Sequence, residues 1–223
     1  MGQLLCEAVE QADDLTLAAA TDRPGPPELS DASLVIDFSL PSGTDALLDV
    51  IGERTLITGT TGLPAGLQER VARHALRAAV VQAGNFSTGV NVLIRLLRSA
   101  AAALPDYDVE IVEMHHRRKV DAPSGTAMAL AGAVQQAARG GDLVHGREGH
   151  TGPRERGPIG MHALRGGDIA GEHMVYLAGP GERLQLGHLA TGRQVFAEGA
   201  LRAARWAVSQ PPGLYDMADV LAP

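Results

Sequence analysis

Lys119 is the only lysine of the chain, and it lies in the segment richest in polar chemistry. Lysine and arginine together number 19, so every other basic residue is an arginine. A lysine in such a composition indicates a site that needs a compact, mobile ammonium rather than a planar guanidinium. The surrounding run reads Glu113-Met-His-His-Arg-Arg-Lys-Val-Asp-Ala-Pro-Ser-Gly-Thr-Ala127. Imidazoles exchange protons near neutral pH and cations hold anions, so the run predicts chemistry on a small anionic substrate.

Two other interpretations of this run are less favoured. His115 and His116 are a possible metal pair, but no cysteine lies near them and no H-x-x-x-H or H-E-x-x-H spacing is present, so we expect no metal. The basic stretch is a possible solvated face or nucleic-acid patch. It is short, lacks interleaved aromatic residues and belongs to a protein of net charge −7, so we expect no nucleic acid.

The composition is that of a globular protein with a core of small aliphatic side chains. The chain has 223 residues, of which 45% are hydrophobic, 20% charged and only 3% aromatic. Cys6 is the single cysteine, which excludes an intrachain disulfide and suits a reducing compartment. No apolar run reaches the roughly 18 residues of a membrane span, and no leader pattern is found. We therefore expect a cytoplasmic protein without a membrane partner.

The first third of the chain alternates short apolar strands with helices. We expect strands at 15–20, 34–38, 55–58 and 79–83, and helices at 4–9, 42–51 (capped by Ser42) and 64–78. This alternation is typical of βαβ units in a doubly wound parallel sheet.

The pattern changes after Asn85. We expect helices at 88–103, 124–138 and 195–208, a strand beginning near Tyr107, a long loop at 140–158, and strands at 161–164, 172–177 and 182–189. The sequence thus predicts a nucleotide-binding domain (residues 1–86 and 195–223) and an α+β substrate-binding and oligomerisation domain with a mixed sheet (residues 87–194).

The carboxyl ends of the first-domain strands carry glycines, hydroxyls and an acidic residue, where a doubly wound sheet binds its ligand. Taken singly, each strand end is better explained as a simple turn; four ends in register indicate a dinucleotide site. Asp22 followed by Arg23 suits a ribose with or without a 2′-phosphate. The candidate cofactor-binding residues are Asp22, Arg23, Phe38, Gly59, Thr60, Thr61, Ala83, Gly84, Asn85 and Phe86. The G-x-G-x-x-G turn expected after a first strand is absent.

From Met1 to about Val220 the chain resembles the dihydrodipicolinate reductase family. Glu113–Ala127 carries the resemblance most specifically, supported by the segments 35–39, 59–62, 85–91, 147–152, 165–173 and 213–221. The resemblance implies a Rossmann-like fold, NADPH or NADH as cofactor, reduction of a small cyclic imine dicarboxylate in lysine and diaminopimelate biosynthesis, and a homotetramer. Whether NADH or NADPH is preferred stays open.

The resemblance also implies roles for individual residues. His115 would donate the proton, and Lys119 would be the second catalytic residue, holding a carboxylate and offsetting developing charge. The substrate-binding residues would be His116, Gly125, Thr126 and Arg193. Neighbouring residues on a strand point to opposite faces, so a shared role for His115 and His116 requires a turn or a strand end.

The chain departs from the family at its start. Family members begin with a strand leading into a Gly-x-x-Gly-Arg-Met-Gly turn, of which only Met1-Gly2 is found here, and the segment 23–31 is also short. Either the start is misplaced or the chain is truncated; losing a central strand should expose apolar edges and remove phosphate contacts. Two alternatives follow: a cofactor-free dicarboxylate-binding or assembly protein, and a non-redox lyase or dehydratase using the histidine and lysine cluster.

Overall fold

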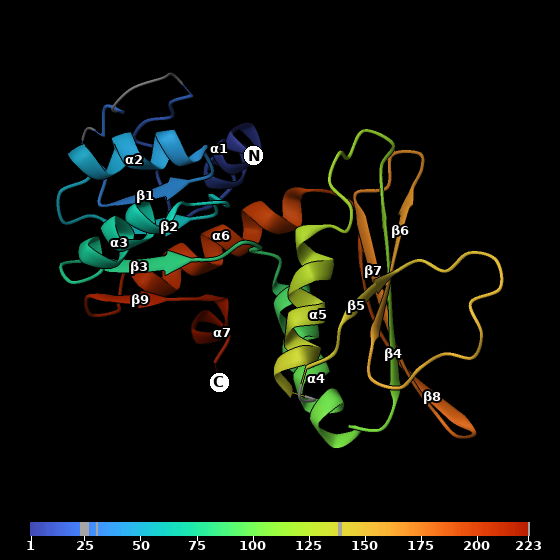
Figure 1. The fold of residues 1–223 in the computed structure, drawn as a ribbon. Helices are drawn as coiled ribbons and strands as arrows, with labels where there is room; N and C mark the ends of the chain where they lie inside the picture. The colour runs from blue at the N-terminus through green and yellow to red at the C-terminus, as the bar shows by residue number, and fades with distance from the viewer. Residues whose placement is uncertain (23–26, 30, 138–139, 223) are drawn as a thin grey trace. The chain divides into compact units, whose positions relative to one another are not determined.

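The chain folds into two compact units, each with its own sheet. The structure, a computed structural model, describes residues 1–22, 27–29, 31–137 and 140–222. Unit 1 comprises Met1–Thr88 and Arg193–Pro223, and unit 2 comprises Gly89–Gly192 (Figure 1).

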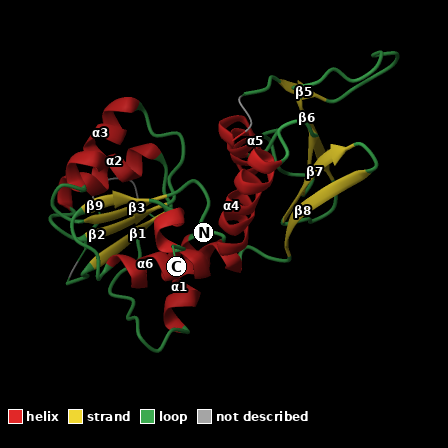
Figure 2. Cartoon of the chain, turned by 90° about the horizontal axis from the view of Figure 1, so that it is seen from below, coloured by secondary structure: helices red, strands yellow, loops and turns green. Residues whose placement is uncertain are grey.

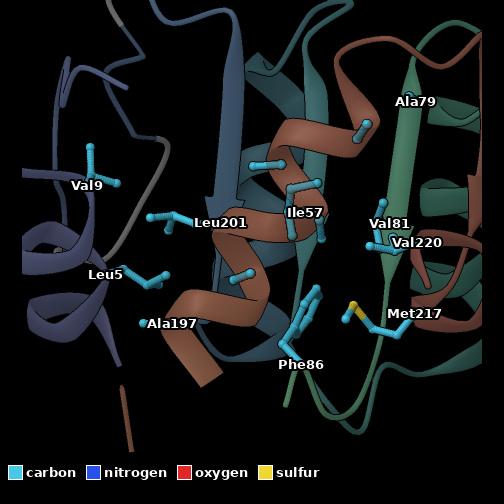
Figure 3. Packing of buried hydrophobic residues seen from close by; sticks show 14 residues of the cluster. Leu5, Val9, Ile57, Ala79, Val81, Phe86, Ala197, Leu201, Met217 and Val220 are labelled. Atoms are coloured by element: carbon cyan, nitrogen blue, oxygen red, sulfur yellow. The ribbon is translucent and has the colours of Figure 1, made fainter. Parts of the chain in front are cut away.

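Unit 1 is built on a four-stranded parallel sheet. Its order is β1 (Leu34–Asp37), β2 (Thr55–Thr58), β3 (Ala79–Gln82) and β9 (Gly213–Tyr215). Helices α2 (Pro41–Val50) and α3 (Ala65–His74) share one apolar cluster with Leu56 and Val80. Helices α1 (Gly2–Glu10), α6 (Gln194–Ala207) and α7 (Met217–Val220) share another with Ile57 and Val81 (Figure 3). Since successive strand residues face opposite sides, these two clusters lie on the two faces of the sheet.

The strand expected at 15–20 is wrong. This segment is irregular and largely exposed. A parallel strand needs a neighbour for its main-chain hydrogen bonds, and β1 is the last strand of the sheet on that side, with no further described strand beside it. Asp22 therefore follows an irregular segment rather than a strand.

Helix α2 begins differently from the prediction. Leu40 is its N-cap and Pro41 its first residue, so the expected cap by Ser42 is wrong. Proline suits this place because its fixed φ matches the helix and its missing N–H would have no partner in the first turn.

Unit 2 holds a five-stranded mixed sheet covered on one face by two helices. The strand order is β5 (Leu143–His145), β6 (Ile159–Arg165), β4 (Asp108–His115), β7 (Gly171–Gly179) and β8 (Glu182–Ala190). β4 runs parallel to β6 and antiparallel to β7. Helices α4 (Thr88–Ala103) and α5 (Gly125–Ala137) pack on one face (Figure 2). β5 falls inside the region expected to be a loop, but the predicted fold class, α/β with a parallel sheet and a second mixed sheet, is confirmed.

One row of polar side chains crosses the helix-covered face of this sheet at one end. β4 buries alternate residues, Val109 and Ile111 with the apolar core and Glu113 and His115 beyond it. The pairings place His115 opposite Arg165, Glu113 opposite His173, and His173 opposite His188. The fold thus gathers titratable groups from four strands beside the start of α5.

Candidate active site

His115 lies at the last position of β4, with its ring against a carboxylate. Its Nδ1 is 2.6 Å from Oε2 of Glu113, which is 1% exposed. An ionised carboxylate has no hydrogen to donate and can only accept hydrogen bonds, so Nδ1 of His115 carries the hydrogen and donates it. Nε2, the other ring nitrogen, faces Gly171, where a Cβ would lie 3.0 Å from it. The main chain at Gly171 therefore leaves room for the ring only because no side chain is present.

Glu113 accepts three further hydrogen bonds, from two residues. Arg165 donates from Nη1 to Oε2 and from Nη2 to Oε1, both at 2.8 Å, and the N–H of Ser124 donates to Oε1 at 3.0 Å. Burial alone would raise the pKa of Glu113, but the hydrogen bonds from Arg165, His115 and Ser124 outweigh it and lower that pKa. The carboxylate is thus charged, and each of its two oxygens accepts two hydrogen bonds.

Lys119 joins the same cluster through Asp121. Its Nζ lies 2.8 Å from Oδ1 of Asp121, whose carbonyl oxygen accepts a hydrogen bond from Nη2 of Arg165 at 2.6 Å. The Lys119 hydrogen bond lowers the pKa of Asp121. An ammonium has three donors, so Lys119 can keep Asp121 and still bind a second carboxylate.

The start of α5 stands beside these groups. Ser124 accepts the N–H of Ala127 on its hydroxyl at 3.2 Å, as an N-cap does. Gly125 and Thr126 form the first turn, where the helix dipole and amides favour an anion. A Cβ at Gly125 would meet no atom within 4 Å, so the space at this turn is open.

His116 follows the strand end, and its N–H donates to the carbonyl of Ile169 at 2.8 Å. The N–H of Lys119 returns to the carbonyl of His116 at 3.1 Å, which closes a turn. The expected strand end at the histidine pair is therefore present. Nδ1 of His116 is buried without a hydrogen-bond partner among the described residues, a polar atom that a ligand could satisfy.

His173 is buried on β7, where it pairs with Glu113 of β4. Its Nε2 lies 3.1 Å from the hydroxyl of Ser124, and its ring meets that of His115 edge-on at 5.3 Å. Burial, and then the charge of His115, lowers the pKa of His173 to about 4, so the side chain is neutral at pH 7.

A second polar centre lies at the strand ends of unit 1, around the buried carboxylate of Asp37. Its Oδ2 accepts hydroxyls from Thr44 at 2.6 Å, Thr58 at 3.1 Å and Thr60 at 3.1 Å, and its Oδ1 accepts the N–H of Ser39 at 3.0 Å. This carboxylate ties α2 to the ends of β1 and β2.

The candidate cofactor residues after β1, β2 and β3 lie at one edge of the sheet. The N–H of Gly59 donates to the carbonyl of Asp37 at 2.8 Å, and that of Ala83 to the carbonyl of Thr58 at 3.1 Å, which joins the three ends. Phe38 lies over Gly59, where a Cβ would come 2.4 Å from the ring. Thr61 and Gly84 are exposed, and a Cβ at Gly84 would meet only Thr61, at 3.8 Å. This open, glycine-containing edge fits part of a dinucleotide.

Not every candidate offers its side chain. Phe86 is 1% exposed in the core, and the Thr60 hydroxyl is used by Asp37, so both have only main-chain groups for a ligand. Asn85 accepts the N–H of Ser87 on its side chain at 2.8 Å. Asp22 and Arg193 are exposed residues of unit 1, and Arg23 lies outside the described residues.

Sequence reasoning gave no catalytic or binding role to Glu113, Arg165 or Asp37. Glu113 and Arg165 lie 52 residues apart, and only the pairing of β4 with β6 brings them together. The signal available for Glu113 was its place at an inward position two residues before His115. Asp37 was noticeable as a lone acid at the end of an apolar strand.

No helix in the described part of the chain is both long and apolar enough to cross a membrane. Within the same described residues, no group of three or more histidine, cysteine or acidic side chains is arranged to hold a metal ion.

Comparison with known proteins gives concordant results for both units. Residues 1–86 match the family model "Dihydrodipicolinate reductase, N-terminus", and residues 89–221 match "Dihydrodipicolinate reductase, C-terminus". Curated proteins named 4-hydroxy-tetrahydrodipicolinate reductase are similar throughout. The protein of Halorhodospira halophila is 45% identical over 253 residues, covering 99% of this chain and 94% of that protein. The protein of Caulobacter vibrioides is 44% identical over 239 residues, with coverages of 99% and 93%.

A solved structure has the same fold. It is described as dipicolinate-bound dihydrodipicolinate reductase from Paenisporosarcina sp. TG-14, and matches with a TM-score of 0.78 at 23% identity over 99% of this chain and 95% of that chain. The alignments with the curated relatives are longer than the 223 residues present here, so they include positions that this chain lacks. Two family models that together span nearly the whole chain, and relatives above 40% identity, give one conclusion: the chain belongs to the dihydrodipicolinate reductase family.

Proposed function

We propose that this chain is a 4-hydroxy-tetrahydrodipicolinate reductase, which reduces a cyclic imine dicarboxylate with a nicotinamide nucleotide in lysine and diaminopimelate biosynthesis. The observation that carries the proposal is the arrangement around His115. A histidine with one nitrogen fixed on a buried carboxylate stands beside a lysine and an open helix start, the groups needed to protonate and hold a dicarboxylate.

The residues of unit 2 would divide the work. The ammonium of Lys119 and the first turn of α5 at Gly125 and Thr126 would bind the substrate carboxylates. His116 would offer its unpaired Nδ1 to the same ligand. His115, protonated on both nitrogens, would give the Nε2 proton to the substrate as negative charge moves toward the ring nitrogen. Arg193, a residue of unit 1, stays a proposed substrate-binding residue on the family resemblance alone.

The cofactor would be held at the strand-end edge of unit 1. Its nicotinamide ring would supply the hydride. Phe38, Gly59, Thr61, Ala83, Gly84 and Asn85 would contact it, with Thr60 and Phe86 contributing main-chain groups and Asp22 and Arg23 near a ribose. NADH and NADPH are both candidates, since an acidic residue favours a ribose hydroxyl and an arginine favours a 2′-phosphate.

The direct test follows absorbance at 340 nm with this chain, each nicotinamide nucleotide, and substrate freshly generated from aspartate semialdehyde and pyruvate. We expect at least one nucleotide to be oxidised, and only when aspartate semialdehyde and pyruvate have both been supplied to form the substrate. If neither nucleotide is oxidised while dipicolinate still binds, the proposal is refuted in favour of a cofactor-free dicarboxylate-binding protein. Turnover of substrate without any nucleotide would indicate a lyase or dehydratase instead.

The role of Lys119 is tested by Lys119→Met. Losing one charge-assisted contact to a carboxylate should weaken dipicolinate binding about tenfold or more, measured by calorimetry. Arg118→Met is the matched control, since it removes the adjacent exposed cation, and it should change the affinity less than about threefold. Equal losses in the two variants would mean that net charge, rather than Lys119, binds the ligand.

The proposal also covers the oligomeric state of the protein and its location in the cell. A homotetramer and a cytoplasmic location are expected from the family resemblance. Exposed Leu164 and Leu189 on the helix-free face of the unit 2 sheet support an association surface there. Light scattering coupled to size exclusion would measure the mass, and a monomer would contradict this part.

A further inference from the structure

The carboxylate of Glu113 connects two parts of the candidate site. Oε2 receives His115, and Oε1 receives the N–H of Ser124 at the start of α5. Arg165 spans both oxygens. With four donors on two oxygens and 1% exposure, the carboxylate has no freedom to move or to turn toward water.

This arrangement decides which nitrogen of His115 can act. Since the ionised carboxylate accepts the Nδ1 hydrogen, Nε2 is left as the nitrogen that exchanges a proton with anything else. The ring plane is limited as well, because the Nε2 edge passes beside Gly171.

We propose that Glu113 is a positioning residue of the reductase: it fixes His115 with Nδ1 protonated and Nε2 directed to the substrate, while Arg165 holds the carboxylate in place. The proposal rests on the proposed function of His115 as proton donor. Glu113 itself does not touch the substrate. Its bond to Ser124 keeps the histidine in a constant relation to the turn that would bind the substrate carboxylate.

The same strand offers a matched control. Glu110 lies three residues earlier, on the opposite face of β4, and its carboxylate likewise binds arginine and histidine side chains, here Arg147, Arg154 and His162. Burial alone would raise its pKa, but these three partners lower that pKa to about 2. A Glu110→Gln substitution therefore repeats the chemical change within β4 without touching His115.

The experiment compares Glu113→Gln with Glu110→Gln in the full chain. For Glu113→Gln we expect kcat to fall about 10- to 100-fold, the range typical of an outer partner that orients a histidine, while KM and the Kd for dipicolinate change less than about threefold. For Glu110→Gln we expect kcat within about twofold of the original protein. Circular dichroism and the mass in solution verify that both variants fold and assemble alike.

Two readouts separate positioning from a purely structural role. In ¹⁵N-histidine spectra recorded at a pH where the His115 ring is neutral, its signals should show the Nδ1–H tautomer in the original protein and a tautomer mixture in Glu113→Gln. In a His115→Gln background, adding Glu113→Gln should lower kcat no further, because the group that it positions is gone. If Glu113→Gln fails to fold, Arg165→Lys replaces it and should give a smaller loss of kcat at unchanged KM.

The proposal is overturned if Glu113→Gln and Glu110→Gln lose kcat equally, if dipicolinate affinity falls as much as kcat, if the tautomer of His115 is unchanged, or if the losses from His115→Gln and Glu113→Gln multiply. Failure of the proposed function is distinguishable, since the original protein would then oxidise no nucleotide while its histidine spectra could still show the Nδ1–H tautomer.

Discussion

Replacing Asp37 by alanine should destabilise unit 1 strongly. The substitution removes the acceptor of the hydroxyls of Thr44 and Thr58, both 0% exposed. Thr60 keeps an alternative acceptor, the carbonyl of Ser39 at 3.3 Å. Each buried hydroxyl left without a hydrogen-bond acceptor costs about 1–3 kcal/mol. Two such hydroxyls therefore predict a loss of about 2–6 kcal/mol in the free energy of unfolding. That is a large part of the roughly 5–15 kcal/mol of a typical domain.

The chain provides a specific probe for this measurement. Its single tryptophan, Trp206, lies in α6 of unit 1 with its ring 5.0 Å from that of Tyr215, so urea unfolding followed by tryptophan fluorescence reports this unit. Asp45→Ala is the control, because Asp45 is an exposed partner of Arg70, which also binds Asp49. Exposed ion pairs contribute about 0–1 kcal/mol. The reasoning fails if Asp37→Ala costs no more than Asp45→Ala.

Two further predictions concern unit 2. The lowered pKa of His173, about 4 against an ordinary 6.5, means that the unfolded chain binds this proton more readily, so stability falls as the pH drops below 6.5. Between pH 8 and pH 5 this group should lower the free energy of unfolding by about 2 kcal/mol. Calorimetric scans of His173→Gln should show a stability that depends less steeply on pH than that of the original protein. An unchanged slope would contradict the lowered pKa of His173. Gly171→Ala should lower kcat about tenfold by crowding Nε2 of His115. Gly166→Ala is the control, because a Cβ there meets nothing within 4 Å, and its kcat should stay within about twofold of the original value. Equal kcat values in the two variants would show that the His115 ring tolerates the methyl group.

Local patterns in the sequence were sufficient to predict most elements. The apolar runs at β1, β2 and β3, and the helix Thr88–Ala103, are where the patterns predict them, because burial on both faces of a sheet or along a helix leaves a direct mark on composition. The short β9 and α7 were not predicted. Each is only a few residues long, and the periodicity that marks a longer element is not visible over so short a stretch.

The errors arise from partners that a local pattern does not show. Leu15–Ala20 has the composition of a strand, but a strand exists only beside another strand, and no described one lies next to it. Similarly, the single segment Glu113–Ala127 identified the candidate site but not its support. Arg165 and His173 reach Glu113 and Ser124 through the pairing of strands distant in sequence, which a single sequence does not specify.

The two glutamates of β4 have a consequence for how the chain avoids misfolding. Glu110 and Glu113 face opposite sides of one strand, each enclosed by arginine donors from other segments. A shift of β4 by a single residue would exchange its two faces and separate both carboxylates from their arginines in the same step. It would also turn the apolar residues Val109 and Ile111 away from the helices. A misaligned sheet would therefore bury unpaired charge on one side and expose apolar surface on the other, so that only one alignment of this strand is stable.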